Sequence, residues 1–298
     1  MKLAKWQGLG NDYLIVEEEA LPGPLSAEAI ELLCDRHLGI GSDGILLSCP
    51  PTGAIPNAVA RMRVFNPDGG EPEMCGNGIR MFARYLERCG AVADADFVVE
   101  TLAGPITPRL LDGGAVRVDM GLARFRSANV DAPGSGDVVS AYLQANGCDY
   151  EFTFVDVGNP HCVIPVDDPL TFDVCGVGPL MERHPYFPNR TNVEFIRVER
   201  DGSVTMRVWE RGVGETQACG TGATAAAAAC VRLGLASSPV VVHLLGGDLT
   251  IEVEDTGRAV ALATERRVFM TGPTEEICSC HLSGDLLRRL GWPASIDH

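Results

Sequence analysis

The amino-acid sequence predicts an α/β protein with mixed sheets, made of two homologous domains related by a pseudo-twofold axis. Each domain should be a curled sheet around a central helix, with an active site in the cleft between the domains. Three observations support this prediction: a set of motifs occurs twice in the same order, strand-like runs outnumber helical ones, and each copy has a helix that starts after a Cys-Gly-x-Gly motif. The length of 298 residues suits two domains.

The repeat is clearest around the two Cys-Gly-x-Gly motifs. Residues 62–65, Met-Arg-Val-Phe, recur at 206–209 as Met-Arg-Val-Trp. Gly-Glu follows in both copies, and then Cys-Gly-Asn-Gly at 75–78 matches Cys-Gly-Thr-Gly at 219–222, always 144 residues further on. Further segments fit at nearby offsets in the same order, so we infer two copies of one unit.

The domain limits follow from the repeat. The first copy ends near Gly121, and the chain after Val268 belongs to neither copy. We therefore place the first domain at residues 1–121 plus 268–298 and the second at 122–267, with the tail returning to pack on the first domain.

Strand signals are distributed along both copies. The expected strands include a run that opens at residues 10–11, Gly-Asn, and continues through Val16, and two runs within 98–120 that flank a turn at 112–114. Further strands are expected at 152–155, 161–164, 240–242 and 250–253, with a second turn at Asp255 and Gly257.

A first helix should begin after Ser26, which is a suitable N-cap, and continue to about Arg36. Its apolar face would consist of Ile30, Leu33, Cys34 and His37.

The helices after the two motifs differ in character. After Cys75, apolar residues recur at helical spacing at Ile79, Phe82, Ala83 and Leu86. On the same helix, Arg80, Arg84 and Arg88 form a basic stripe, which we interpret as a solvated or domain-facing side. After Cys219 the helix contains five alanines at 225–229 and is apolar all round, so it should be buried.

Composition and charge narrow the class of function. Forty acidic residues against 24 basic ones give a net charge of −16, which disfavours nucleic-acid and membrane partners. The N-terminus lacks a hydrophobic signal core, which favours a cytoplasmic protein. The only lysines are Lys2 and Lys5, so a pyridoxal phosphate Schiff base is not expected. The eleven cysteines, an odd number, should be free thiols, and we expect no metal site.

The chemistry of the site follows from where the two cysteines stand. A helix N-terminus offers free N–H groups and a partial positive charge, which lower a thiol pKa and bind a carboxylate. In a duplicated fold the two helix starts should meet, with one thiol on each side of a bound carboxylate. Two acid/base groups that flank one α-carbon can remove a proton from one face and return one to the other. The enolate-like charge would develop on the carboxylate, and no cofactor is needed.

The sequence resembles the diaminopimelate epimerase family over nearly its whole length. The motifs that carry the resemblance lie at residues 8–13, 65–70, 75–78, 158–162 and 210–223. The resemblance implies interconversion of LL- and meso-diaminopimelate, on the way to lysine and peptidoglycan, without cofactor or metal. It also implies that the protein is a homodimer. Its only other partner would be the small-molecule substrate.

The resemblance further implies roles for individual residues. Cys75 and Cys219 would be the two acid/base residues, and the backbone N–H groups of Gly76, Asn77, Gly220 and Thr221 would hold the carboxylate at the reacting centre. Asn66, Asn159, Asn192 and Arg211 would recognise the distant carboxylate, Glu210 would accept from an ammonium group, and Asn11 would contact substrate near the reacting centre. His161 would support thiol protonation, with a purely structural role as the equal alternative.

Some positions depart from the family pattern. Gly70 and Pro67 stand where serine and alanine are frequent, and Gly44 stands where some members have a glutamine that contacts substrate. Residues 50–57 look like a longer surface loop.

Three other functions remain open at this stage. A proline-racemase type would carry a histidine at the position of Asn77, and a phenazine-biosynthesis isomerase would lack the cysteine pair. A thiol-redox or amino-acid-binding protein without catalytic activity would exchange no α-hydrogen with solvent.

Overall fold

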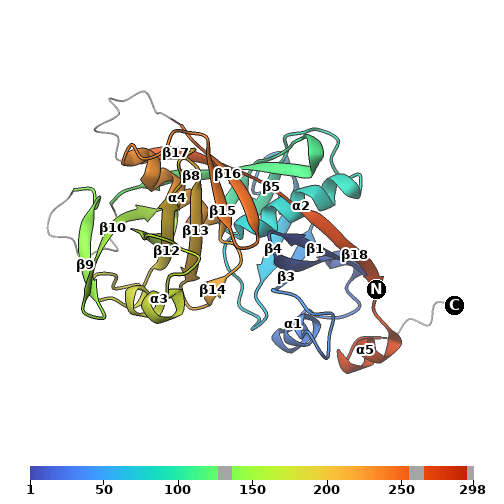
Figure 1. Cartoon of the computed structure of the whole chain (residues 1–298). Helices are drawn as coiled ribbons and strands as arrows, with labels where there is room; N and C mark the ends of the chain where they lie inside the picture. Colours follow the sequence, from blue (N-terminus) through green and yellow to red (C-terminus); the bar gives the residue numbers. More distant parts are fainter. Residues whose placement is uncertain (127–135, 255–264, 294–298) are drawn as a thin grey trace. The chain divides into compact units, whose positions relative to one another are not determined.

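The computed structural model describes residues 1–126, 136–254 and 265–293. The chain divides into two compact units, of which unit 1 comprises Met1–Val118 and Pro273–His298 and unit 2 comprises Asp119–Gly272. The limits between them fall inside two strands, β8 (Ala115–Arg124) and β17 (Glu265–Pro273) (Figure 1). The sequence prediction had placed these limits at residues 121 and 268. The predicted turn at Asp255 and Gly257 lies outside the described residues.

Unit 1 is a seven-stranded mixed sheet in the order β18-β1-β2-β3-β4-β5-β6. The strands of this sheet are β1 (Lys2–Gly8), β2 (Asn11–Glu17), β3 (Ile45–Cys49), β4 (Ala58–Phe65), β5 (Val98–Thr101), β6 (Gly104–Ile106) and β18 (Glu275–His281). Unit 1 also contains β7 (Pro108–Leu110), which pairs with β8 instead of joining this sheet, and the helices η1 (Glu18–Ala20), α1 (Ala27–Cys34), α2 (Gly76–Arg88), η2 (Asp112–Gly114) and α5 (Gly284–Arg289). The tail joins this unit because β18 pairs antiparallel with β1.

Unit 2 repeats the same order of pairings. Its strands are β9 (Ala141–Ala145), β10 (Cys148–Asp156), β11 (Pro160–Pro165), β12 (Asn192–Val198), β13 (Val204–Glu210), β14 (Gly214–Thr216), β15 (Val240–Leu244) and β16 (Gly247–Val253), and its helices are α3 (Val174–Glu182) and α4 (Gly220–Arg232).

The strand-by-strand match extends to direction and register. The pairs β2–β3 and β11–β12 are parallel, and the pairs β3–β4 and β12–β13 are antiparallel. Leu14 pairs with Ile45 in unit 1, and Cys162 pairs with Val193 in unit 2, which are the positions 148 residues later in both strands. The predicted mixed α/β fold with two repeated domains is therefore confirmed.

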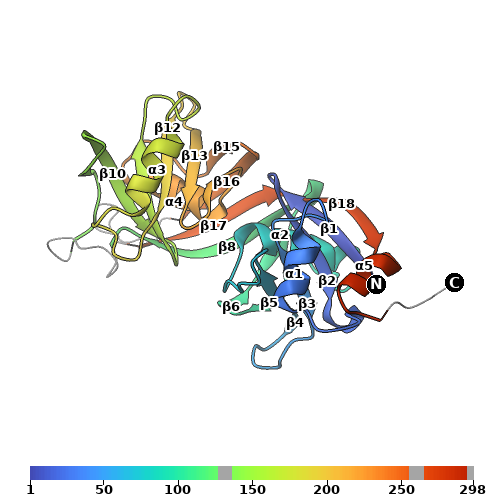
Figure 2. The ribbon, with the colours of Figure 1, turned by 90° about the horizontal axis from the view of Figure 1, so that it is seen from below.

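The helix after each Cys-Gly-x-Gly motif is the centre of its unit. Helix α4 contacts β10, β11, β12, β13, β15 and β16, and helix α2 contacts β1, β2, β4 and β7. Figure 2 shows α4 among the strands of its unit from a second direction. Each of the alanines at 225–229 in α4 has no exposed surface, as its apolar sequence predicts.

One sequence prediction about the helices was wrong, and the solvated interpretation of the basic stripe holds only in part. Helix α1 ends at Cys34, so His37 is exposed and off its apolar face. The reason is Asp35, whose Oδ1 accepts hydrogen bonds from the backbone N–H groups of His37 and Leu38 and turns the chain. On α2 the basic stripe is not uniformly solvated, because Arg80 is fully buried while Arg88 is exposed.

The buried packing of α4 yields a test of stability. Ala227→Leu should destabilise the protein by about 1–3 kcal/mol, because three extra carbons must enter a site with no free surface. Thermal unfolding followed by circular dichroism measures this change. Ala20→Leu, in the exposed helix η1, is the control and should leave the melting temperature within error. Equal melting temperatures for both variants would contradict the tight packing.

Candidate active site

Cys75 is the N-cap of α2. Its backbone is extended, with φ −134° and ψ 118°, and its Sγ accepts a hydrogen bond of 3.2 Å from the N–H of Gly78. The hydroxyl oxygen of Tyr13 lies 3.6 Å from the same Sγ. The thiol therefore takes the place that a serine or aspartate side chain usually occupies at a helix start.

Cys219 holds the same position in unit 2. It is the N-cap of α4, with φ −129° and ψ 112°, within a few degrees of the values at Cys75. Its Sγ lies 3.5 Å from the hydroxyl of Thr221, and the residue is only 5% exposed. The repeat has thus preserved the backbone geometry of the thiol in both units.

The second glycine of each motif makes room for the thiol. A Cβ on Gly78 would lie 3.0 Å from Leu46 Cδ2 and 3.4 Å from the Cys75 Sγ. A Cβ on Gly222 would lie 2.9 Å from Glu194 Oε1 and 3.4 Å from the Cys219 Sγ. A side chain at either position would press on Leu46 or Glu194, which come from the strand behind, and would touch the sulfur, so glycine is the residue that fits there without displacing them.

A network of charged side chains fixes Asn11 in unit 1. The Asn11 Nδ2 donates to Asp43 Oδ2 at 2.9 Å, and the Asn11 Oδ1 accepts from Asn77 Nδ2 at 3.2 Å. Arg36 contacts both Asp43 and Asp12 at 2.7 Å. Burial alone would raise the pKa of Asp12, but the hydrogen bonds from Arg36 and Lys5 outweigh burial and lower it. The structure therefore joins Asn11 and Asn77 next to Cys75.

Arg80 lies beneath the first turn of α2. Its Nη1 donates to the carbonyl of Gly76 at 3.0 Å, and its Nη2 donates to Asn77 Oδ1 at 3.0 Å. Burial lowers the pKa of this guanidinium to about 10, partly offset by the nearby Cys75. Arg80 thus ties the first turn of α2 to the side chain of Asn77.

A continuous polar chain runs behind Cys219 in unit 2. The His161 Nδ1 lies 2.6 Å from Glu194 Oε1, and the His161 Nε2 lies 2.9 Å from Asn159 Oδ1. The Asn159 Nδ2 lies 3.5 Å from the hydroxyl of Thr221, which contacts the Cys219 Sγ. The structure thus brings together four of the predicted residues with Glu194, which the sequence prediction did not include.

The surroundings of Cys219 disfavour its thiolate. Burial raises the pKa of Cys219 well above its ordinary value, and the carboxylates of Glu210 and Glu194 raise it further. Burial likewise raises the pKa of Glu194. In the substrate-free protein these surroundings therefore favour the protonated thiol of Cys219.

The remaining predicted residues of unit 2 cluster at the end of β13. Asn192 is nearly buried, and its Oδ1 accepts from the backbone N–H of Arg211 at 2.9 Å while its Nδ2 donates to the Pro160 carbonyl at 3.1 Å. Arg211 is exposed and donates to the carbonyl of Asn189. The Glu210 carboxylate accepts from the hydroxyl of Thr216. Asn192 thus anchors the backbone that carries Arg211.

Three predicted residues are placed mainly by their backbone. Gly76 and Gly220 are the first residues of α2 and α4, so their N–H groups belong to the free helix starts. Asn66 is exposed in the loop directly after β4, where its N–H and carbonyl close a turn with Gly69 and Gly70. It stands 144 residues before Glu210, at the same place in the repeat.

Sequence reasoning missed Tyr13, Asp43 and Glu194. Tyr13 follows Gly-Asn by one residue, as His161 does in the second copy, so the repeat itself carried this signal. Glu194 is an acidic residue inside the run Val-Glu-Phe-Ile at 193–196, and a single acidic residue among apolar ones is the pattern of a buried polar group. For Asp43 the sequence carried no signal that we recognise.

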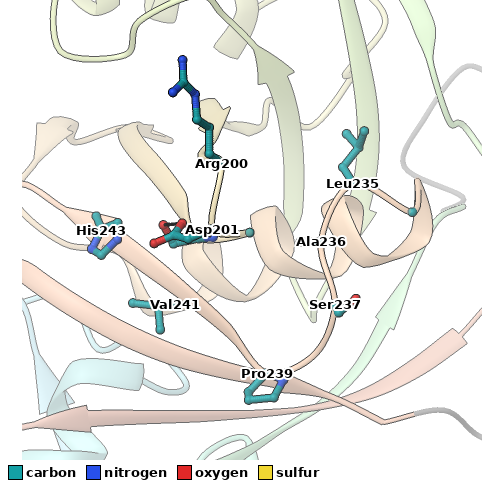
Figure 3. Close-up of a pocket in the computed structure, with 11 residues that line it drawn as sticks. Arg200, Asp201, Leu235, Ala236, Ser237, Pro239, Val241 and His243 are labelled. Carbon is teal, nitrogen blue, oxygen red and sulfur yellow. Dashed lines mark hydrogen bonds between the residues drawn. The ribbon is translucent and has the colours of Figure 1, made fainter.

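The surface also contains a hollow that is separate from these residues. It has a volume of about 490 Å3 and is lined by residues 200–203, 234–237, 239, 241 and 243 of unit 2 (Figure 3). It contains none of the predicted site residues and adjoins the C-terminal end of α4, whereas Cys219 caps the other end. In the described part of the chain no helix is long and apolar enough to cross a membrane, and no group of three or more His, Cys, Asp or Glu is arranged to hold a metal ion.

Solved structures share this fold at low sequence identity. A hydroxyproline epimerase from Agrobacterium vitis matches with a TM-score of 0.68 at 14% identity, covering 95% of this chain and 90% of that one. A probable proline racemase from Agrobacterium radiobacter matches at 0.67 and 15%, covering 95% and 92%. A PhzF-family protein from Bacillus anthracis matches at 0.67 and 16%, covering 95% and 99%. Identities this low show the fold alone.

Sequence comparison is more specific. The family model described as Diaminopimelate epimerase matches residues 3–126 and 153–275. The Diaminopimelate epimerase of Moorella thermoacetica is 47% identical over 93% of this chain and 97% of its own length. That of Desulforudis audaxviator is 48% identical over 93% and 97%, and that of Desulfitobacterium hafniense is 45% identical over 96% and 100%. The chain therefore belongs to the diaminopimelate epimerase family.

Proposed function

We propose that this chain interconverts LL- and meso-diaminopimelate without a cofactor, with Cys75 and Cys219 as the two acid/base residues. The observation that carries the proposal is the matched pair of cysteine N-caps, one in each copy of the repeat. The relatives named Diaminopimelate epimerase, which align along almost the entire chain, support the choice of substrate.

The proposed reaction begins with a thiolate on one side of the α-carbon and a thiol on the other. The thiolate takes the α-proton, and the electron pair of the C–H bond moves into an enolate-like carboxylate. The opposite thiol then donates its proton to the other face of the carbon, and the configuration is inverted. The two sulfurs have exchanged protonation states at the end, and the reverse reaction starts from that state.

The helix starts would stabilise the charge that develops on the carboxylate. The N–H groups of Gly76, Asn77, Gly220 and Thr221 belong to the free first turns of α2 and α4, and they are fixed before substrate binds. Donors that are already in place act on the enolate-like charge without reorganisation.

The remaining polar residues would recognise the rest of the substrate. Asn66, Asn159, Asn192 and Arg211 would bind the distant carboxylate, with Arg211 forming a bidentate pair. Glu210 would accept from an ammonium group, and Asn11 would contact substrate near the reacting centre. The anchoring of Arg211 by Asn192 and of Asn11 by Asp43 supports this assignment, because both reduce the ordering that binding requires.

The resemblance to the family extends the proposal to the setting of the enzyme. We infer a cytoplasmic homodimer that serves lysine biosynthesis and needs no metal. Sedimentation or light scattering on the purified protein tests the dimer.

Hydrogen exchange at the α-carbon tests the reaction. The reduced protein, incubated with LL-diaminopimelate in deuterated water and no added cofactor, should incorporate deuterium and approach the meso form, as followed by NMR. Cys75→Ser should lower the epimerisation rate by about 10²–10⁴-fold, the usual contribution of a general acid or base. A folded, reduced protein that exchanges no α-hydrogen of diaminopimelate would refute the proposal. If the protein instead exchanged the α-hydrogen of another amino acid in a panel, that amino acid would replace diaminopimelate as the proposed substrate.

Oxidation tests whether the two thiols reach the same carbon. Two such sulfurs should be close enough to join when substrate leaves, which requires Cα atoms about 4.4–6.8 Å apart. Mild oxidation should therefore abolish activity, and a reductant should restore it. Mass spectrometry of the digested protein should find a Cys75–Cys219 peptide, absent in Cys75→Ser. Full activity after complete oxidation would contradict the shared site.

Alkylation tests the charge that surrounds Cys219. Because the Glu210 carboxylate raises the pKa of Cys219, Glu210→Gln should shift the pH dependence of Cys219 alkylation to lower pH. At a fixed neutral pH the substrate-free variant should react about three to ten times faster, since one pKa unit is a tenfold change in thiolate. Peptide mapping measures the rate, and Glu199→Gln, whose carboxylate binds Thr205, should react as wild type. An unchanged or slower rate in Glu210→Gln would be inconsistent with this charge effect.

A further inference from the structure

A buried pair of titratable side chains, His161 and Glu194, lies behind the first turn of α4. Neither side chain has any exposed surface, and Nδ1 of the imidazole is 2.6 Å from Oε1 of the carboxyl group. Within the described residues, the second oxygen, Oε2, is buried and has no hydrogen-bond partner. A group with one strong contact and one unpaired oxygen is held in place mainly by that contact, so His161 and Glu194 must be considered as a unit.

The partners of His161 determine how many protons the pair holds. Nε2 faces Asn159 Oδ1 at 2.9 Å, and since an amide oxygen only accepts, this orientation of the amide pairs with a hydrogen on Nε2. A hydrogen is also needed between Nδ1 and Oε1, because two unprotonated acceptors would repel at 2.6 Å. The pair is therefore either imidazolium with carboxylate or neutral imidazole with carboxylic acid. Both forms have zero net charge, and both keep the hydrogen on Nε2.

The hydrogen on Nε2 has a consequence for Asn159. A hydrogen on Nε2 and the amide oxygen that faces it go together, and the amide nitrogen then lies on the other side, 3.5 Å from the hydroxyl of Thr221. If Nε2 were bare, the amide would gain by rotating half a turn and donating to it. The oxygen would then face outward, where it would repel a carboxylate.

The first copy of the repeat shows that the fold does not require this pair. The position that matches Glu194 is Leu46, which lies behind Gly78 as Glu194 lies behind Gly222. The position that matches His161 is Tyr13, whose hydroxyl contacts Cys75 directly. The same strand pairings are therefore compatible with an apolar residue at the position of Glu194, so they do not by themselves demand the carboxyl group.

We propose that Glu194 is a positioning residue: it keeps His161 in the form with hydrogen on Nε2, and His161 in turn keeps the Asn159 amide nitrogen facing outward as a donor to substrate. This inference rests on the proposed function, in which Asn159 binds a substrate carboxylate. Glu194 acts only through His161 and Asn159 and touches no reacting atom.

Substitution of Glu194 tests the proposal through substrate affinity. Glu194→Leu, which introduces the residue of the first copy, should raise KM for diaminopimelate by about tenfold or more, the cost of a lost hydrogen bond to a charged group, and change kcat much less. Glu194→Gln can donate to Nδ1 and keeps the Nε2 hydrogen, so its KM should stay within about threefold of wild type. Glu100→Leu removes a buried carboxylate that binds Thr52 in unit 1, and it should leave both constants unchanged.

A double-mutant cycle tests whether the effect passes through Asn159. In an Asn159→Ala background, Glu194→Leu should change KM by less than about twofold, because the donor that it misplaces is already gone. Additive effects of the two substitutions would overturn the proposal, and so would an unchanged KM in Glu194→Leu alone.

Nitrogen-15 NMR of His161 in the substrate-free protein gives a readout that does not depend on activity. Wild type and Glu194→Gln should both show a protonated Nε2, and Glu194→Leu should lose this preference. A bare Nε2 in wild type would overturn the proposal, even if Glu194→Leu does not fold. If the protein showed this NMR pattern but did not epimerise diaminopimelate, the proposed function would fail while the coupling of Glu194 to His161 would stand.

Discussion

The position of a cysteine at the N-cap of a buried helix is the constraint on which the rest of this structure depends. A helix start leaves backbone N–H groups without partners inside the helix, and in α2 and α4 a cysteine stands at this start. Strands that contact each helix leave no room to move it. The glycine three residues after each cysteine follows from this arrangement, since a Cβ there would meet both the sulfur and the strand behind. Local sequence, helix placement and thiol chemistry are thus fixed together.

The two copies keep this backbone but surround it with different charges. Arg80 and Thr224 occupy matched positions, and each donates to the carbonyl of the residue after its cysteine. Cys75 therefore has a buried cation below it, whereas Cys219 has a neutral hydroxyl there and the carboxylates of Glu194 and Glu210 nearby. The backbone of the repeat is thus shared by the two copies, but the charges around the two thiols are not.

Local patterns predicted the elements that local chemistry determines. The helix starts at Cys75 and Cys219, the buried alanines of α4 and the turn at residues 112–114 all follow from short-range signals. The buried Arg80 could not be predicted in this way, because helical spacing gives the face of a residue but not the surface that covers it. The contact between His161 and Glu194 joins two strands 33 residues apart, and only the parallel pairing of β11 with β12 brings them together.

The duplication also separates what folding needs from what the site needs. Burying a charged or polar group without full compensation costs stability, so a side chain such as Arg80 or Glu194 is unfavourable unless it has another role. In most proteins this cost cannot be attributed to folding or to function, because no version of the same fold without the charged group is known. Here the other copy shows that fold: Thr224 and Leu46 stand at the matched positions within the same strand pairings. These buried ionisable groups are therefore not demands of the strand pairings, and each of them lies beside the helix start that carries a cysteine.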